Sequence, residues 1–129
     1  LQAFGFGQKT EIDLPGEAGG LVKHPREWGR RSVASISMGQ EIGVTPIQMV
    51  SAVAAIANDG VLMKPYGVSE IRDTHGRGLK QMLPQVKRRV IAPDTARTVT
   101  TILEGVVTDG TGGKAAIPGF RVAGKTGTA

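Results

Sequence analysis

The residues with the clearest chemical potential stand at the end of the sequence, where Lys125, Thr126, Gly127 and Thr128 follow one another. A lysine here can place its cation beside a substrate carboxylate or beside a hydroxyl group that relays protons, and a threonine hydroxyl can hydrogen-bond a substrate. The glycine lets an acyl substrate lie directly against the backbone. Residues 120–123 alternate in the manner of a β-strand, so we expect a strand to deliver these four residues to a binding site.

The same stretch also fits a phosphate-binding loop. Residues 119–126 read GFRVAGKT, which matches the pattern G-x-x-x-x-G-K-[ST]. Such a loop needs a buried strand entering it and a helix leaving it, so that backbone N–H groups face the phosphates. Here the strand-like residues occupy the loop itself, Pro118 argues against a central strand before it, and Gly127 is a poor start for a helix. A P-loop nucleotide-binding protein is therefore only a remote alternative.

Composition places the chain among globular proteins of about one domain. It has 129 residues, of which 40% are hydrophobic and 21% charged, and it contains no cysteine. Disulfides, thiol catalysis and cysteine-bound metals are therefore excluded. The two histidines, His24 and His75, are isolated from each other, so we expect no metal and no other cofactor. No apolar run approaches the ~20 residues that a membrane span needs.

The net charge of +5 would suit an anionic partner. The positive charge is concentrated late in the chain, in a run that contains no carboxylate between its members: Arg77, Lys80, Lys87, Arg88 and Arg89. No signature of a nucleic-acid-binding fold and no pattern of stacking aromatic residues accompanies this run. The sequence therefore predicts a solvated basic face and no nucleic-acid partner.

Two helices are predicted. The first runs from about Pro46 to Asn58, with Thr45 as N-cap, Gln48 completing a capping box, and Gly60 suited to the left-handed position after the end. It has almost no polar face, so we expect it to be buried. The second begins near Pro93 and carries an apolar stripe at helical spacing, formed by Ala96, Val99, Leu103 and Val106.

Strand signals lie elsewhere. Residues 61–73 are rich in strand formers and are interrupted at Pro65, and residues 79–83 can return as a partner across a turn. Residues 11–17 alternate polar and apolar side chains, which would place Glu11 and Asp13 on one strand face as a possible acid and base pair. Two carboxylates beside a turn are usually just solvated, and nothing near them in the sequence would shift their pKa values.

Five blocks of the sequence carry a family resemblance in a consistent order. The chain resembles the transpeptidase domain of class B penicillin-binding proteins, most closely the septal, cell-division group. The blocks are GFGQKTEIDLPGE (5–17), SMGQEIGVTPIQM (37–49), AAIANDGVLMKP (54–65), RRVIAPDTA (88–96) and GTGGKAAIPGFRVAGKTGTA (110–129). The resemblance implies an α/β fold of the α+β kind, related to serine β-lactamases, with helices packed on an antiparallel sheet.

The resemblance also implies an activity. Such proteins cross-link peptidoglycan: a serine attacks the D-Ala-D-Ala carbonyl of a stem peptide, and the acyl group passes to an amine on a neighbouring strand. β-Lactams mimic the dipeptide and leave a stable acyl-enzyme. The third family motif corresponds to Lys125, Thr126 and Gly127, with Lys125 in proton transfer and electrostatics. The hydroxyls of Thr126 and Thr128 would bind the substrate carboxylate, and the Thr128 N–H would join the oxyanion hole.

The other two family motifs are absent from this sequence. The nucleophile belongs to S-x-x-K and its partner to S-x-N, yet none of the serines has lysine three residues on or asparagine two residues on: Ser32, Ser35, Ser37, Ser51 and Ser69. We therefore expect residues 1–129 to be part of a transpeptidase domain that starts after S-x-N and ends just past K-T-G. Alone, such a piece lacks the nucleophile for acyl transfer.

The expected partners belong to the longer parent protein. They are peptidoglycan stem peptides, β-lactam antibiotics and membrane proteins of the division machinery. The resemblance implies a parent anchored in the bacterial cytoplasmic membrane with this domain on the outer side, although no anchor lies within residues 1–129. A non-catalytic penicillin-binding sensor or a structural paralogue remains the alternative.

Overall fold

The computed structural model describes residues 1–127 and shows an α+β fold, as predicted. Within these residues three α-helices alternate with short antiparallel strands, and 3₁₀ helices cover Gln2–Phe4, Pro25–Glu27 and Gly113–Ala115. The helices are α1 (Ser32–Ser37), α2 (Pro46–Ala57) and α3 (Pro93–Thr108). The strands are β1 (Leu21–Val22), β2 (Ile42–Gly43), β3 (Val61–Lys64), β4 (Glu70–Arg72), β5 (Gly78–Gln81) and β6 (Gln85–Arg89).

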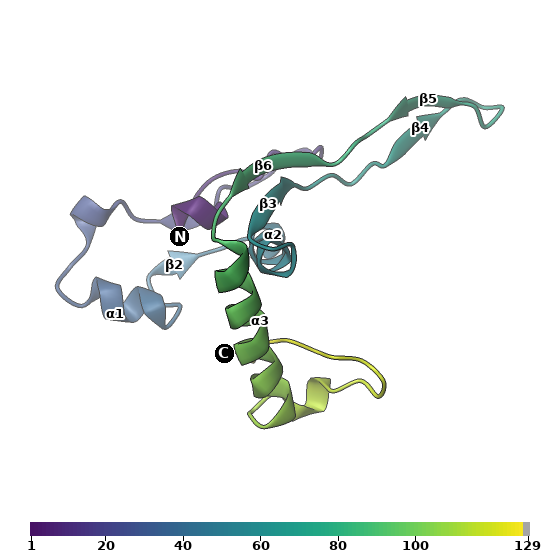
Figure 1. Cartoon of the computed structure of the whole chain (residues 1–129). Coiled ribbons are helices and arrows are strands. Elements are labelled where there is room, and N and C mark those ends of the chain that lie inside the picture. Colours follow the sequence, from purple (N-terminus) through teal and green to yellow (C-terminus); the bar gives the residue numbers. More distant parts are fainter. Residues whose placement is uncertain (128–129) are drawn as a thin grey trace.

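The strands pair only in twos within the described residues: β1 with β2, β3 with β6, and β4 with β5. The β3–β6 and β4–β5 ladders follow each other along one long hairpin that leads away from the helices (Figure 1). The predicted partner of the hairpin, residues 79–83, corresponds to β5. Strand β6 was not predicted, because its charged sequence QVKRR hides the alternation that usually marks a strand.

Helix α2 begins as predicted. The Thr45 side chain accepts a hydrogen bond from the Gln48 N–H, and the Gln48 side chain accepts one from the Thr45 N–H, which completes the capping box. At the other end Gly60 adopts a φ of +83°, and a Cβ there would lie 2.2 Å from the carbonyl oxygen of Ile91. Glycine is therefore required at this position both by the backbone conformation and by the close approach of residue 91.

The core is small and lies where α2 meets β3 and α3. Its buried apolar side chains are Ala52, Ala55, Leu62 and Ala96, and Val107 is buried separately near the C-terminal end of α3. The prediction that α2 is buried all round is wrong for the described residues, because Val50 and Val53 are 63% and 53% exposed. The described elements that pack against α2 reach only one of its sides, so its apolar outer side faces solvent.

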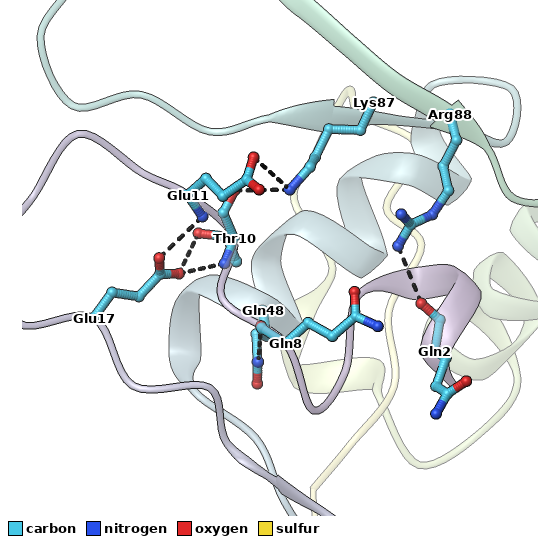
Figure 2. Close-up of polar contacts among 8 residues, drawn as sticks. All are labelled: Gln2, Gln8, Thr10, Glu11, Glu17, Gln48, Lys87 and Arg88. Carbon is cyan, nitrogen blue, oxygen red and sulfur yellow. Dashed lines mark hydrogen bonds and ion pairs between the residues drawn. The ribbon is translucent and has the colours of Figure 1, made fainter.

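Gln48 is the largest side chain that is fully buried. Its Nε2 donates to the carbonyl oxygen of Gln8 at 2.7 Å (Figure 2) and to that of Gly19 at 2.8 Å. Its Oε1 accepts from the Thr45 N–H at 2.9 Å. Gly20 passes so close that a Cβ would lie 2.8 Å from Gln48 Oε1. One side chain thus joins the N-terminal segment, the entry to β1 and the start of α2.

The basic run is not simply solvated, contrary to the prediction. The Lys87 Nζ donates to the Thr10 carbonyl at 3.1 Å and pairs with Glu11 at 3.3 Å (Figure 2). The Arg88 guanidinium donates to the carbonyls of Ala3 and Gln2, and that of Arg89 to the Asp59 carbonyl. Strand β6 therefore uses its cations to hold the N-terminal segment against the hairpin.

We predict that Gln48→Ala destabilises the full-length protein by about 3 kcal/mol, because it empties a fully buried position and removes the donor to the carbonyls of residues 8 and 19. Urea unfolding monitored by circular dichroism measures the change. The control is Gln40→Ala, at an exposed glutamine, which we expect to stay within about 0.5 kcal/mol of wild type. Equal stabilities of the two variants would contradict the role assigned to Gln48.

Candidate functional site

The C-terminal segment that carries Lys125, Thr126 and Gly127 lies alongside α3 (Figure 1). The Gly124 N–H donates to the Leu103 carbonyl of α3 at 3.1 Å. Three residues earlier the Arg121 guanidinium pairs with the Glu104 carboxylate at 2.8 Å. The hydrogen bond that Arg121 donates to Glu104, together with the negative charge of Glu104, raises the pKa of Arg121 above its ordinary value. Two contacts to the same helix therefore set the position of the K-T-G residues.

A cation and two hydroxyl groups meet at this segment. The Lys125 Nζ lies 2.9 Å from the Thr126 carbonyl oxygen and 3.3 Å from Thr126 Oγ1. Thr126 Oγ1 in turn lies 3.1 Å from Thr111 Oγ1 in the turn after α3. All three residues are exposed. An ammonium group beside two hydroxyls can bind a carboxylate by charge-assisted hydrogen bonds.

Thr111 is a residue of the candidate site that the sequence did not single out. It belongs to the glycine-rich turn at the start of the last block, residues 110–129. A threonine among glycines gives no periodic signal, and its partner stands 15 residues further along the chain. Only the return of the chain along α3 brings the two hydroxyls together.

The predicted strand over residues 120–123 is not present. These residues have no regular secondary structure, although the Phe120 N–H donates to the Ile117 carbonyl in a turn. A strand requires a hydrogen-bonded neighbour, and no strand in residues 1–127 pairs with this segment. The fourth predicted site residue, Thr128, lies outside the described residues.

The geometry also disfavours a phosphate loop. Within residues 1–127 no strand enters residues 119–126, and no helix leaves them. The backbone N–H groups of Phe120 and Gly124 already donate to carbonyls at residues 117 and 103. A P-loop instead points its N–H groups at the phosphates, so the match to G-x-x-x-x-G-K-[ST] is a coincidence of spacing.

The carboxylates at the N-terminal end are structural, and the strand proposed for them is absent. Glu11 has a φ of 64° and pairs with Lys87, whereas Asp13 accepts hydrogen bonds from the N–H groups of Gly67 and Val68 at 2.6 and 3.1 Å. Glu17, which was not predicted, accepts from the Thr10 N–H and hydroxyl and from the Glu11 N–H (Figure 2). These contacts orient loops, so no acid and base pair forms here.

Contrary to the sequence expectation, these contacts change pKa values. The Gly67 N–H is the main cause that lowers the pKa of Asp13, against a smaller opposing effect of burial, with further help from Val68 and the charge of Lys64. Burial acts to raise the pKa of Glu17, but the hydrogen bonds from Thr10 and Glu11 together lower it. Both carboxylates are therefore held in the ionised form.

Neither metal chemistry nor a membrane span is indicated within residues 1–127. No group of three or more potential metal-binding side chains comes together there. No helix in this part of the chain combines the length and the apolar character that crossing a bilayer requires.

Comparison with known proteins identifies the family to which the chain belongs. The profile of the penicillin binding protein transpeptidase domain matches residues 1–129. The chain therefore belongs to the penicillin-binding protein transpeptidase family, which confirms the resemblance drawn from the five blocks.

Curated relatives include a sporulation protein and a peptidoglycan D,D-transpeptidase. The chain is 43% identical to stage V sporulation protein D of Bacillus subtilis over 130 residues, covering 100% of the chain and 20% of that protein. It is 35% identical to the peptidoglycan D,D-transpeptidase FtsI of Escherichia coli, covering 98% of the chain and 20% of that protein. The chain thus spans about a fifth of the length of these relatives.

Solved structures support the same family membership. Penicillin-binding protein 3 of Mycobacterium tuberculosis superposes with a TM-score of 0.90 at 38% identity, covering 100% of this chain and 30% of that one. The same TM-score and identity are found for that protein complexed with ampicillin. The α+β arrangement described above is therefore part of a transpeptidase fold.

The hydrogen bonds accepted by Asp13 predict that the thermal stability of the protein depends on pH. Because its pKa is lowered on folding, the stabilisation is present above the pKa of the unfolded chain and is lost as pH falls through the folded value. We therefore expect Asp13→Ala to lower the Tm of the full-length protein at pH 7, and the difference from wild type to shrink between about pH 5 and pH 3. Differential scanning calorimetry measures this difference in Tm. A difference that does not change with pH would contradict the stabilising role assigned to the ionised Asp13 carboxylate.

Proposed function

We propose that this chain forms part of a serine-type peptidoglycan D,D-transpeptidase, and that Lys125, Thr126, Gly127 and Thr128 form one wall of its active site. The observation that carries the proposal is the contact of the Lys125 ammonium group with the Thr126 hydroxyl, which is itself next to Thr111. The family match over residues 1–129 supports the same assignment.

The proposed roles follow from the chemistry of these groups. A stem peptide ends in a D-Ala carboxylate, which the Lys125 cation and the Thr126 hydroxyl suit as partners. Lys125 would also assist proton transfer to and from the attacking serine. A Cβ at Gly127 would meet nothing within 4 Å, so this stretch leaves open space for an acyl substrate to lie against the backbone. Thr128 would add a hydroxyl for the carboxylate and an N–H for the oxyanion.

The remaining parts of the mechanism are assigned to the longer parent. Its S-x-x-K serine would attack the D-Ala-D-Ala carbonyl, release D-Ala and form the acyl-enzyme, which an amine of a neighbouring strand then resolves. A β-lactam would acylate the same serine. Residues 1–129 would then extend from after the S-x-N motif to just past K-T-G, in a protein anchored in the cytoplasmic membrane, facing outward and working with division proteins.

We expect Lys125→Ala in the full-length protein to reduce the rate of labelling by a fluorescent penicillin at least about 100-fold, because a charge that stabilises the acylation transition state is lost. The matched control is Lys114→Ala, an exposed lysine in the 3₁₀ helix Gly113–Ala115, which should label at the wild-type rate. A folded Lys125→Ala protein that labels normally would contradict the assignment.

A second experiment compares penicillin labelling of residues 1–129 alone with labelling of the full-length protein. Residues 1–129 expressed alone should show no covalent labelling by penicillin, because no serine in them belongs to S-x-x-K or S-x-N. The full-length protein should label with one equivalent. An unlabelled, folded full-length protein would instead identify a non-catalytic paralogue, and labelling of the isolated chain would refute the placement of the nucleophile.

A further inference from the structure

The whole net charge of the chain resides in one structural unit. We use the term arm for residues 64–89, the projecting hairpin that contains β4, β5 and β6 (Figure 1). The arm holds seven lysines or arginines and two carboxylates, whereas the other residues hold nine of each. The excess of +5 therefore belongs to the arm, and the rest of the chain is neutral.

The two carboxylates of the arm are already paired within it. Glu70 pairs with Arg72 at 2.6 Å, and Asp73 pairs with Arg77 at 2.8 Å while also accepting from the backbone of the hairpin tip. Neither Lys64 nor Lys80 forms an ion pair with any residue in the range 1–127. These two lysines are the cations of the arm that are open to an external partner.

Both lysines line a groove of about 410 Å³. Its apolar lining includes Tyr66, Met82 and Leu83, and Leu83 is 67% exposed. Asp13 also lines the groove, and its charge partly offsets that of Lys64. Its two oxygens, however, accept the N–H groups of residues 67 and 68, which keeps the carboxylate turned to the backbone. The lining of the groove thus combines apolar side chains with two lysines.

The rest of the arm also exposes apolar side chains. Large apolar side chains stand exposed along it, with Leu79, Leu83 and Val86 each about two thirds exposed at 67%, 67% and 66%. A simple polyanion would satisfy the lysines but leave this apolar surface in water. The β4–β5 ladder has only two strands, so its outer edges also carry backbone groups that a further strand can pair with. An extended peptide can use all three features at once.

We propose that the arm and its basal groove bind an extended acidic segment of a partner protein, with apolar side chains of that segment in the groove and carboxylates on Lys64 and Lys80. Charge complementarity with the arm selects an acidic partner, and the exposed apolar side chains select a protein over a polysaccharide or a free anion. The arm and the C-terminal segment leave the helices in different directions (Figure 1), so this surface is separate from the K-T-G residues.

The test uses the full-length protein and a fluorescein-labelled synthetic peptide of about eight residues that alternates glutamate and leucine, a length that suits one added strand. Fluorescence anisotropy should show saturable binding that weakens as salt is raised. The double variant Lys64→Glu, Lys80→Glu should bind at least about tenfold more weakly, and Leu83→Ser should weaken binding severalfold.

Matched controls make the result specific. Lys114→Glu changes an exposed lysine outside the arm and should bind the peptide like wild type. The rate of penicillin labelling should be unchanged in the Lys64→Glu, Lys80→Glu protein. Because the charge of Lys64 also favours the ionised Asp13 carboxylate, the single variant Lys80→Glu, which should weaken peptide binding severalfold with an unchanged thermal melt, separates loss of docking from loss of folding.

Four outcomes would overturn the proposal. An oligoglutamate peptide of equal length that binds as tightly would show that apolar contacts are not used. Tighter binding to phosphatidylglycerol vesicles would point to a membrane surface. Unchanged peptide binding by the double variant would place the site elsewhere. Absence of peptide binding to the full-length protein would mean that another part of the parent covers the groove.

Discussion

The buried amide of Gln48 is the interaction on which most of the described structure depends. It connects three segments that are remote in sequence, through carbonyls at residues 8 and 19 and the N–H of residue 45. A buried amide that lost one of these partners would keep its desolvation cost without compensation. The network is therefore cooperative, and it specifies the path of the N-terminal segment over the start of α2. The glycine at position 20 is part of the same constraint, since any side chain there would displace the amide.

Strand β6 holds the same N-terminal segment through a second set of hydrogen bonds. Its cations bind backbone carbonyls of the N-terminal segment, so a segment with little regular structure of its own is held by hydrogen bonds from Lys87 and Arg88. Hydrogen bonds from a charged donor are stronger than neutral ones, which suits them to a segment with few apolar contacts. The basic run therefore clamps the N-terminal segment through Lys87 and Arg88, whereas Lys80 of the same arm has no such partner among residues 1–127.

Helix α3 connects the packed core to the C-terminal segment that carries the K-T-G residues. Its inner side packs on α2 through Ala96, and its C-terminal half receives the returning chain through Leu103 and Glu104. The K-T-G residues therefore take their position from a helix that belongs to the core. This explains how exposed residues with no strand around them are nonetheless placed beside Thr111.

The sequence by itself determined the local features: the capping box at Thr45, the glycine stop at residue 60, the hairpin turn, the second helix and the family motif at Lys125. Each depends on side-chain chemistry within a few residues. The tertiary structure decided what is set by distant partners. The bonds from Gln48 to residues 8 and 19, the clamp made by β6, the Asp13 carboxylate and the Thr111–Thr126 contact join residues 15 to 86 positions apart. The missing strand at residues 120–123 has the same cause, because strand formation requires a neighbouring strand that alternation in one segment does not supply.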